Sequence, residues 1–333
     1  MPFSNLPHHV ADWHSVLAAP LFTPQADTLV AQDQLQHSGG VVVLLGEVLT
    51  REEVQLVVAE LARRGISWQL LAPFVLDEVQ VLVLALDRHE PELAHWLKMQ
   101  EWPVDGIHVA RLPRLDQPGL ILMDMDSTAI QIECIDEIAR LAGVGEQVSA
   151  VTAAAMQGKL EFADSLRNRV ALLKDAPTSI LDQVAANIPL MPGLTLLVDE
   201  ARAAGWKVCI ASGGFTRFAG KLQQDLGLDH IEANELETDG DKLTGRVLGR
   251  IVDAKVKAET LELLRDRYQV AVGQTVAIGD GANDLPMLKL AALGVAIHAK
   301  PIVREQAQVA IRQQDLEAVL CLLKAGSAIA ALS

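Results

Sequence analysis

The strongest constraint on the fold of this chain is a series of short apolar runs separated by helical stretches. The runs cover residues 120–123, 207–211, 275–278 and 294–297. Continuous apolar runs of this length are typical of strands that are buried on both faces of a parallel sheet. We therefore expect an α/β core with a Rossmann-like parallel sheet from about residue 119 onward.

The first three runs end in residues that suit phosphate chemistry. Asp124 and Asp126 follow the first run, Ser212-Gly213-Gly214 follows the second, and residues 279–284 (Gly-Asp-Gly-Ala-Asn-Asp) follow the third. In open α/β sheets the ligand lies outside the carboxyl ends of the strands, so we expect these three loops to converge on one crevice. This convergence is the main evidence for a catalytic site.

Asp124 and Asp126 are two positions apart, where a buried strand opens into a loop. In extended backbone such side chains point to the same side, so both carboxylates can flank one reacting group. One can attack phosphorus while the other handles a proton. Taken alone, the pair could be a solvated acidic turn, and it is the downstream loops that favour covalent phosphoryl transfer.

The N-terminal part has a different pattern. Strands are expected at residues 41–45, 67–71, 79–86 and 107–109, with helices at 51–64 and 91–102, which gives the order βαββαβ. In the first helix Val54, Leu56, Val57, Val58 and Leu61 are expected on the periodic apolar face. The order predicts a small antiparallel sheet backed by two helices, an α+β domain of the ferredoxin-like kind.

Two further segments complete the expected organisation. Residues 113–118 contain two prolines and precede a glycine, so we expect a linker between an N-terminal domain (1–112) and the α/β domain (119–333). Residues 135–190, between the first two strands of the core, have several amphipathic helical stretches and are too long for a crossover loop. We interpret them as an inserted helical cap, with a decorative helical subdomain as the alternative. The tail 325–333 is expected to be a last packed segment.

Composition excludes several classes of protein. The 333 residues are 50% hydrophobic and carry a formal net charge of −15, which argues against nucleic acid as a partner because phosphate backbones are held by clustered Lys and Arg. No run reaches the roughly 18 apolar residues of a membrane span. The three cysteines are widely spaced and odd in number, so we expect a reducing, cytoplasmic location.

The motifs together resemble those of the haloacid dehalogenase superfamily. Residues 124–128 (Asp-Met-Asp-Ser-Thr), Ser212-Gly213, Lys257 and residues 279–284 match its four motifs in order. Within it the phosphoserine phosphatase family is the nearer match, because residues 133–140, 156–162 and 165–174 resemble its cap signature and residues 242–247 its hairpin. The likeness covers about residues 119–323.

The resemblance implies hydrolysis of O-phospho-L-serine to L-serine and phosphate, the last step of serine biosynthesis. It makes Asp124 the nucleophile that becomes an aspartyl-phosphate, and Asp126 the acid and base. Lys257 would neutralise charge on the phosphoryl group. By spacing alone Lys255 is a rival, and a solvated helix lysine is the alternative for both.

The resemblance also implies one Mg²⁺ ion, since the loops offer oxygen ligands only. Its ligands would be a carboxylate oxygen of Asp124, the backbone carbonyl of Asp126 and the side chain of Asp280. Asp284 would orient Lys257. The phosphoryl oxygens would be bound by the residues that follow the second and third strands, namely Ser212, Gly213 and Asn283.

Substrate selection is expected from the cap. Glu133 matches the family position that binds the substrate ammonium, and Arg169 the position that binds its carboxylate. Met156 and Phe162 would pack along the carbon chain. Without the resemblance, surface charges and ordinary core residues would be the favoured interpretation of all four.

Alternatives remain for the function and for the N-terminal region. The same chemistry could serve another small phosphomonoester or transfer phosphate to an alcohol, and a regulatory binding protein with an inactive core is a third reading, which the retention of Asp126 disfavours. The βαββαβ order is similar to ACT domains, so L-serine is a candidate regulator, although residues 46–50 (Gly-Glu-Val-Leu-Thr) replace the expected glycine-bearing loop. A homodimer is a candidate assembly.

Overall fold

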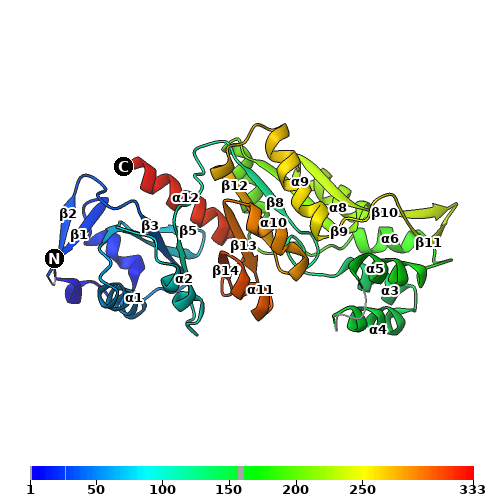
Figure 1. The fold of residues 1–333 in the computed structure, drawn as a ribbon, viewed down its shortest axis with the longest axis horizontal. Helices are drawn as coiled ribbons and strands as arrows, with labels where there is room; N and C mark the ends of the chain where they lie inside the picture. The colour runs from blue at the N-terminus through cyan, green and yellow to red at the C-terminus, as the bar shows by residue number, and fades with distance from the viewer. Residues whose placement is uncertain (1, 27, 157–160) are drawn as a thin grey trace.

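The chain is seen here as a computed structural model that describes residues 2–26, 28–156 and 161–333. Figure 1 shows an elongated arrangement, with an N-terminal sheet at one end, a larger core sheet in the middle and a group of short helices at the other end. Both sheets carry helices on their faces. The predicted cap stretch 156–162 lies partly outside the described residues, since it includes residues 157–160.

The core sheet has the strand order β11-β10-β9-β8-β12-β13-β14. The strands are β8 (Leu120–Met123), β9 (Lys207–Phe215), β10 (His230–Asp239), β11 (Lys242–Leu248), β12 (Thr275–Gly279), β13 (Leu293–Ile297) and β14 (Val309–Ile311). All neighbours pair in parallel except β10 and β11, which form an antiparallel hairpin. The predicted parallel α/β core is therefore confirmed.

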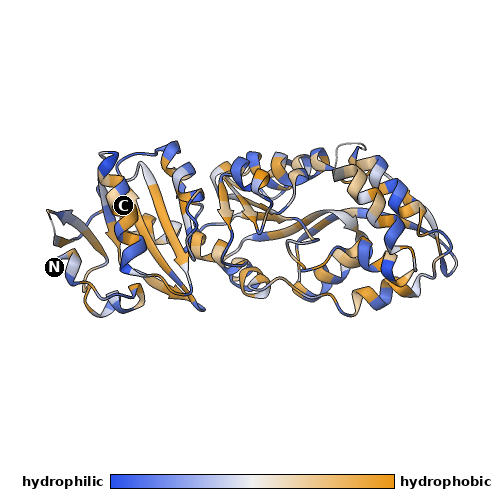
Figure 2. Ribbon diagram, turned by 90° about the horizontal axis from the view of Figure 1, so that it is seen from below, coloured by the Kyte–Doolittle hydropathy of each residue, from blue (hydrophilic) through white to orange (hydrophobic). Residues whose placement is uncertain are grey.

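Helices cover both faces of this sheet because its central strand is apolar on both sides. In β8, Leu120 and Leu122 pack with one set of helices, and Ile121 and Met123 pack with the other. The helices of the core are α7 (Leu194–Ala203), α8 (Thr216–Leu226), α9 (Ala254–Arg267), α10 (Leu285–Leu290), α11 (Pro301–Gln306) and α12 (Glu317–Ala331), with 3₁₀ turns η3 (Val272–Gln274) and η4 (Ala282–Asp284). Figure 2 shows the apolar strands enclosed between these layers.

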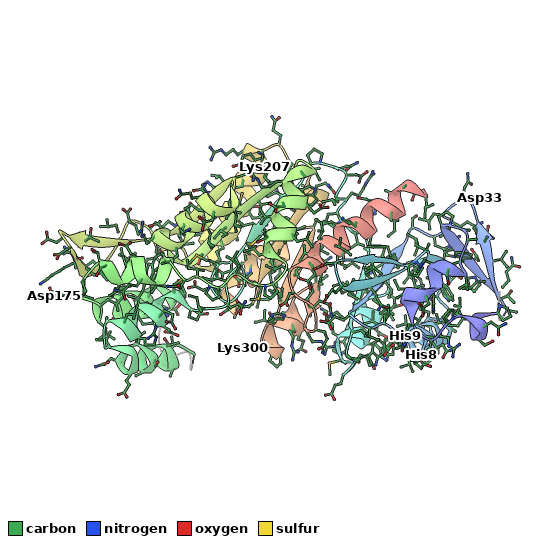
Figure 3. The ribbon with its side chains drawn as sticks, turned by 180° about the vertical axis from the view of Figure 1, so that it is seen from behind. His8, His9, Asp33, Asp175, Lys207 and Lys300 are labelled. Carbon is green, nitrogen blue, oxygen red and sulfur yellow. The ribbon has the colours of Figure 1, made fainter. Side chains whose placement is uncertain are left out.

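Four helices between β8 and α7 form the cap, which we define as α3 (Cys134–Leu141), α4 (Gly145–Met156), α5 (Phe162–Ala171) and α6 (Ser179–Ala185). The β10–β11 hairpin extends from the core sheet to support them, and the Asp175 N–H (labelled in Figure 3) donates to the Leu243 carbonyl at 2.9 Å. The inserted helical segment that the sequence predicts is thus present and is attached to the core by backbone hydrogen bonds.

The N-terminal sheet has the order β2-β1-β4-β6-β3-β7, with β5 paired to β6, and all pairs are antiparallel. Its elements are η1 (Phe3–Asn5), η2 (Val10–Ser15), β1 (Leu21–Gln25), β2 (Thr28–Gln32), β3 (Gly40–Gly46), α1 (Arg51–Arg63), β4 (Trp68–Leu71), β5 (Phe74–Leu76), β6 (Val79–Leu86), α2 (Pro91–Lys98) and β7 (Asp105–Val109). The predicted α+β arrangement is confirmed and is larger than expected.

Three details of the N-terminal prediction were wrong. Strands β1, β2 and β5 were not expected from the sequence. Leu56 was expected on the buried face of α1, but it is 52% exposed because it lies roughly 200° around the helix from Val54. Helix α2 ends at Lys98 instead of residue 102, since Pro103 disfavours helical backbone at Trp102 and the Gln100 carbonyl accepts a hydrogen bond from Arg312.

Helix α12 joins the two sheets. Its residues 318–323 are all fully buried, which is typical of a helix covered on every side. It packs against α7 of the core on one side and against β3 and β6 of the N-terminal sheet on the other, as Figure 1 shows between the two parts. In the predicted tail 325–333, Ala325 and Gly326 are buried and Ala328, Ile329 and Leu332 pack against the core, so this segment is packed as predicted. The helix covers the face of the N-terminal sheet opposite α1 and α2.

A buried aspartate fixes the same junction. Asp105, at the start of β7, is 1% exposed and accepts backbone N–H groups from the three residues after β14: Arg312 at 2.9 Å, Gln313 at 3.0 Å and Gln314 at 3.0 Å. In the part of the chain that the structure describes, these three N–H groups make no other hydrogen bond. Because buried donors without a partner are costly, this carboxylate stabilises the attachment of the two sheets.

We predict that Asp105→Ala lowers the free energy of unfolding by about 2–4 kcal/mol, because three donors lose their acceptor at once. Urea unfolding of the full chain measures this. Asp33→Ala is the matched control, since Asp33 is an exposed acid of the N-terminal part (Figure 3) and its loss should change stability by less than about 0.5 kcal/mol. Equal midpoints for the two variants would contradict the role of Asp105.

Candidate active site

The loops after β8, β9 and β12 meet in one cavity of about 600 Å³, as the parallel sheet requires. The core contributes Asp124, Asp126, Ser212, Gly213, Asp280 and Asn283, and the cap contributes Glu133, Phe162, Ser165 and Arg169. The sequence-predicted residues are thus brought together from both sides. Met156 is the exception, because its side chain lies outside the described residues.

Lys257 lies beneath the cavity, between two carboxylates. Its Nζ is 2.7 Å from Asp124 Oδ2 and 2.8 Å from Asp284 Oδ1, and its side chain is fully buried. Helix α9 places it there because Asp253 caps the helix by accepting the Val256 N–H at 2.9 Å. The rival Lys255 is exposed and pairs with Glu259, so geometry separates the two lysines.

The charges of this group depend on each other. Burial alone would lower the pKa of Lys257, but the carboxylates of Asp124 and Asp284 more than offset that effect and raise it. Burial raises the pKa of Asp284, while hydrogen bonds from the Lys257 ammonium at 2.8 Å and the Gly281 N–H at 2.9 Å favour its ionised form. Lys257 and Asp284 therefore form a buried pair of an ammonium and a carboxylate.

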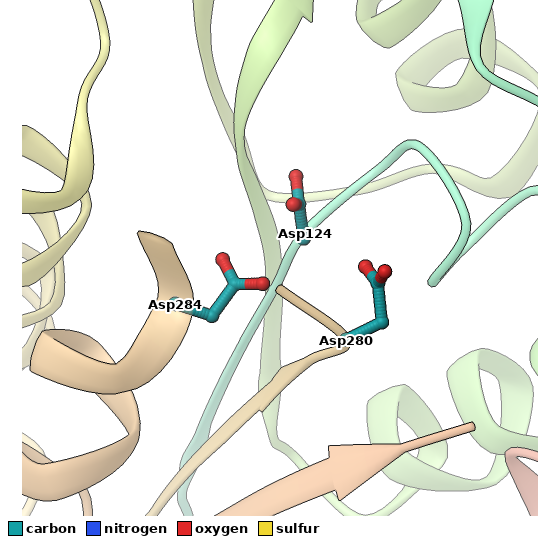
Figure 4. Close-up of side chains that lie close together, drawn as sticks. All are labelled: Asp124, Asp280 and Asp284. Atoms are coloured by element: carbon teal, nitrogen blue, oxygen red, sulfur yellow. The ribbon is translucent and has the colours of Figure 1, made fainter. Parts of the chain in front are cut away.

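The side chains of Asp124, Asp280 and Asp284 lie close together in Figure 4, and one carboxylate oxygen of each lies within 4.8 Å of the others. Both oxygens of Asp284 are engaged, by Lys257 and by Gly281. Asp280 Oδ1 accepts the Thr128 hydroxyl at 3.0 Å, which fixes its orientation. Burial and the charge of Asp124 raise the pKa of Asp280. Such a group of hard oxygen donors fits a divalent cation.

Asp126 is the second carboxylate of the strand-end pair. Its Oδ1 atom is buried and has no hydrogen-bond partner among the described residues. Burial, and then the charge of Glu133, raise its pKa well above the usual range of an aspartic acid. A carboxyl group in this environment can hold a proton and give it up again.

The β9 end forms a tight cradle. Ser212 is buried, and its Oγ accepts the Gly214 N–H at 2.9 Å. A Cβ on Gly213 would lie 2.6 Å from the Phe162 ring, so glycine is needed for the cap to approach this loop. Asn234 of β10, which the sequence analysis did not identify, donates to the Gly213 carbonyl at 2.8 Å and accepts the Val252 N–H at 2.9 Å.

Glu133 and Arg169 face the cavity from the cap. The Ser127 hydroxyl donates to Glu133 Oε1 at 2.8 Å, and Ser127 has a left-handed backbone with φ of 57°. Partial burial raises the pKa of Glu133 and lowers that of Arg169. Among the described residues, no carboxylate lies within ion-pair distance of the Arg169 guanidinium, whose Nε is 3.4 Å from the Ser165 carbonyl. Glu133 and Arg169 therefore offer a carboxylate and a guanidinium at the cap side of the cavity.

Other cavity residues were not identified from the sequence. Asp136 lies on the first turn of α3, and Lys300 (labelled in Figure 3) lies in the loop after β13, at the carboxyl end of that strand. The position of Lys300 follows from the rule that located the other loops, so the end of the fourth apolar run was the signal that could have found it. Asp136 had no comparable signal.

Comparison with known proteins agrees with this site. Residues 118–292 match the family described as haloacid dehalogenase-like hydrolase. With its parallel core, its inserted cap and its paired strand-end aspartates, the chain belongs to this family of hydrolases.

Among curated relatives, the phosphoserine phosphatase of Vibrio cholerae is 56% identical over 222 residues, which is 67% of this chain and 68% of that protein. The phosphoserine phosphatase of Haemophilus influenzae is 54% identical over 226 residues, 67% of this chain and 72% of that protein. The crystal structure of a probable phosphoserine phosphatase from Vibrio cholerae, in unliganded form, covers 91% of this chain and 92% of its own with a TM-score of 0.76 and 46% identity.

A solved phospho-aspartyl intermediate analogue of phosphoserine phosphatase is similar over the catalytic part. It covers 61% of this chain and 98% of its own length, with a TM-score of 0.58 and 43% identity.

Among the described residues, no helix has both the length and the apolar character that a membrane span needs.

Proposed function

We propose that this chain hydrolyses O-phospho-L-serine to L-serine and phosphate, which is the last step of serine biosynthesis. The observation that carries the proposal is one cavity in which strand-end aspartates of the core face an anion and a cation of the cap. Phosphoserine bears a phosphate, an ammonium and a carboxylate. Glu133 and Arg169 have suitable charges for the last two, and the loop of Ser212 and Gly213 offers hydrogen-bond donors for the phosphate. The relatives named above are phosphoserine phosphatases.

In the first half-reaction Asp124 attacks phosphorus, and the bond between phosphorus and the seryl oxygen breaks. Lys257 holds one oxygen of the nucleophile at 2.7 Å, which leaves the carboxylate oriented for attack. Asp126 gives its proton to the departing seryl oxygen, and its raised pKa suits that task. The Ser212 hydroxyl and the Gly213 N–H bind phosphoryl oxygens, with Asn283 beside them.

In the second half-reaction Asp126, now ionised, takes a proton from water as the water attacks the phosphorylated Asp124. The products are inorganic phosphate and the free carboxylate. The cap helps here because it limits access of bulk water to the acyl phosphate before the first product leaves. Asn234 keeps the phosphate-binding loop in place through its bond to the Gly213 carbonyl.

We propose Mg²⁺ as the cation at this site, held by Asp124, Asp280 and the backbone carbonyl of Asp126. When bound, it offsets the repulsion between the carboxylates and the phosphate and polarises a phosphoryl oxygen. Asp284 stays with Lys257 as the residue that orients it, since both of its oxygens already accept hydrogen bonds.

Substrate selection is assigned to the cap. Glu133 binds the ammonium, and Arg169 binds the carboxylate through parallel hydrogen bonds that a lysine cannot make. Phe162 packs beside the short carbon chain, next to Gly213. Met156 is proposed for the same apolar contact on sequence grounds only.

The test is phosphate release from phosphoserine with Mg²⁺ present, with Mg²⁺ removed by EDTA, and with phosphothreonine or a sugar phosphate instead. We expect Mg²⁺-dependent turnover with a clear preference for phosphoserine. Arg169→Ala should lower kcat/KM for phosphoserine by about 10²-fold, because a charge-assisted bidentate contact of roughly 3 kcal/mol is lost. Its effect on O-phosphoethanolamine, which has no carboxylate, should be far smaller.

Arg167→Ala is the matched control, because Arg167 is an exposed arginine of the same helix that pairs with Asp164. Equal turnover of all phosphomonoesters by the wild-type chain would replace phosphoserine with a broader substrate class. Phosphate transfer to an added alcohol would instead favour a phosphotransferase.

We further propose L-serine as a regulator bound by residues 1–112, a domain of its own linked through residues 113–118, because of the ACT-like βαββαβ order. A cavity of about 290 Å³ beside His14 and Gln80 is the candidate site. Titration of the Arg169→Ala chain with L-serine should give heat that His14→Ala removes. Absence of heat would end this proposal.

A cytoplasmic location is proposed because all three cysteines are unpaired and buried. A homodimer is proposed as the assembly of the chain. Cell fractionation and sedimentation equilibrium test the two statements.

A further inference from the structure

The cap contains a buried polar group that the reaction outlined above does not use. Ser165 lies on α5, is 2% exposed and lines the catalytic cavity. Its hydroxyl has no hydrogen-bond partner among the described residues. Only two other buried side-chain atoms in that part of the chain share this property, and one of them, Asp126 Oδ1, belongs to the same cavity.

A helical serine usually satisfies its hydroxyl by bonding the carbonyl one turn earlier. Here the Glu161 carbonyl accepts the Ser165 backbone N–H at 2.9 Å, and the Ser165 hydroxyl does not hydrogen-bond to it. Unpartnered buried hydroxyl groups are rare in folded proteins because they forgo the hydrogen bonds of water. At a cavity wall the missing partner can come from a ligand.

The position of Ser165 indicates which part of a ligand it would meet. Ser165 and Arg169 are four residues apart and share one face of α5. The Arg169 Nε lies 3.4 Å from the Ser165 carbonyl, so the guanidinium lies along the turn that carries the hydroxyl. A hydroxyl donor next to a guanidinium suits a ligand with two acceptor oxygens, as a carboxylate has.

The other end of the cavity is already assigned to phosphate. Ser212 and Gly213 of the core line the same cavity, and Phe162, at the start of α5, lies against Gly213. When they are ionised, Glu133 and Asp136 can accept hydrogen bonds but cannot donate them, so they cannot bind a carboxylate. Among the cavity-lining side chains of α5, Ser165 and Arg169 are the hydrogen-bond donors.

We propose that the Ser165 hydroxyl donates a hydrogen bond to the carboxylate of the amino-acid substrate, beside Arg169, and is thereby a specificity-determining residue. This inference rests on the proposed phosphoserine phosphatase function. A hydrogen bond to the substrate accounts for the polar side chain at this buried position of the cap. The Ser165 hydroxyl would then have a partner only when the substrate is bound.

The test is Ser165→Ala, compared by kcat and KM with phosphoserine and with O-phosphoethanolamine, which keeps the phosphate and the ammonium but has no carboxylate. The ratio of kcat/KM for the two substrates should fall about tenfold, mainly through a higher KM for phosphoserine, since one hydrogen bond to a charged group is lost. Ser149→Ala, on the exposed side of α4, is the control and should leave the ratio unchanged.

Thermal unfolding of the free proteins separates a binding role from a structural one. Removing an unpartnered buried hydroxyl leaves no donor or acceptor unsatisfied, so Ser165→Ala should unfold at the wild-type temperature or above it. A lower unfolding temperature with equal losses on both substrates would overturn the inference, as would an unchanged ratio. If the wild-type chain itself showed no preference for phosphoserine, the proposed function would fail together with this inference.

Discussion

The site depends on one buried interaction, the contact of the Lys257 ammonium with Asp124 and Asp284. An ammonium is costly to bury without a partner, and here two carboxylates at 2.7 and 2.8 Å surround a side chain with no exposed surface. The arrangement ties α9 to the ends of β8 and β12, so Asp124, Lys257 and Asp284 form one group. In the proposed mechanism, the cap residues act on a substrate whose phosphate is held beside this group.

The sequence was sufficient to predict the parallel core and the meeting of its loops, because the signals are local. Each apolar run and the polar residues after it are adjacent in the chain, and parallel strands bring such ends to one edge. Lys257 was preferred over Lys255 by resemblance, and the burial of Lys257 with the exposure of Lys255 gives the physical reason. Glu133 and Arg169 carried no local signal of their own.

The missed features are the ones that depend on distant parts of the chain. Asn234 supports the Gly213 loop only because β10 pairs with β9, and Asp105 meets residues 312–314 across more than 200 positions. Strand β1 contains Pro24, which weakened its pattern, and its pairing with β2 and β4 supplies what the local sequence lacks. The apolar tail was predicted to pack, but not that α12 would be buried between two sheets.

That burial links the N-terminal sheet to the catalytic part. Helix α12 and the Asp105 contact attach the sheet beside β14, while α11, the helix that precedes β14, carries Val303 at the cavity wall. The N-terminal part therefore supports the core edge next to the site, which is a role it has whether or not it binds a regulator.

The account depends most on the phosphorylation of Asp124. Rapid acid quench of the chain during turnover of ³²P-labelled phosphoserine, followed by peptide mapping, tests it directly. We expect label on the peptide that contains Asp124, formed together with the release of serine and before free phosphate, and lost on chase with unlabelled substrate. Steady phosphate release with no label on that side chain at any quench time would contradict the account.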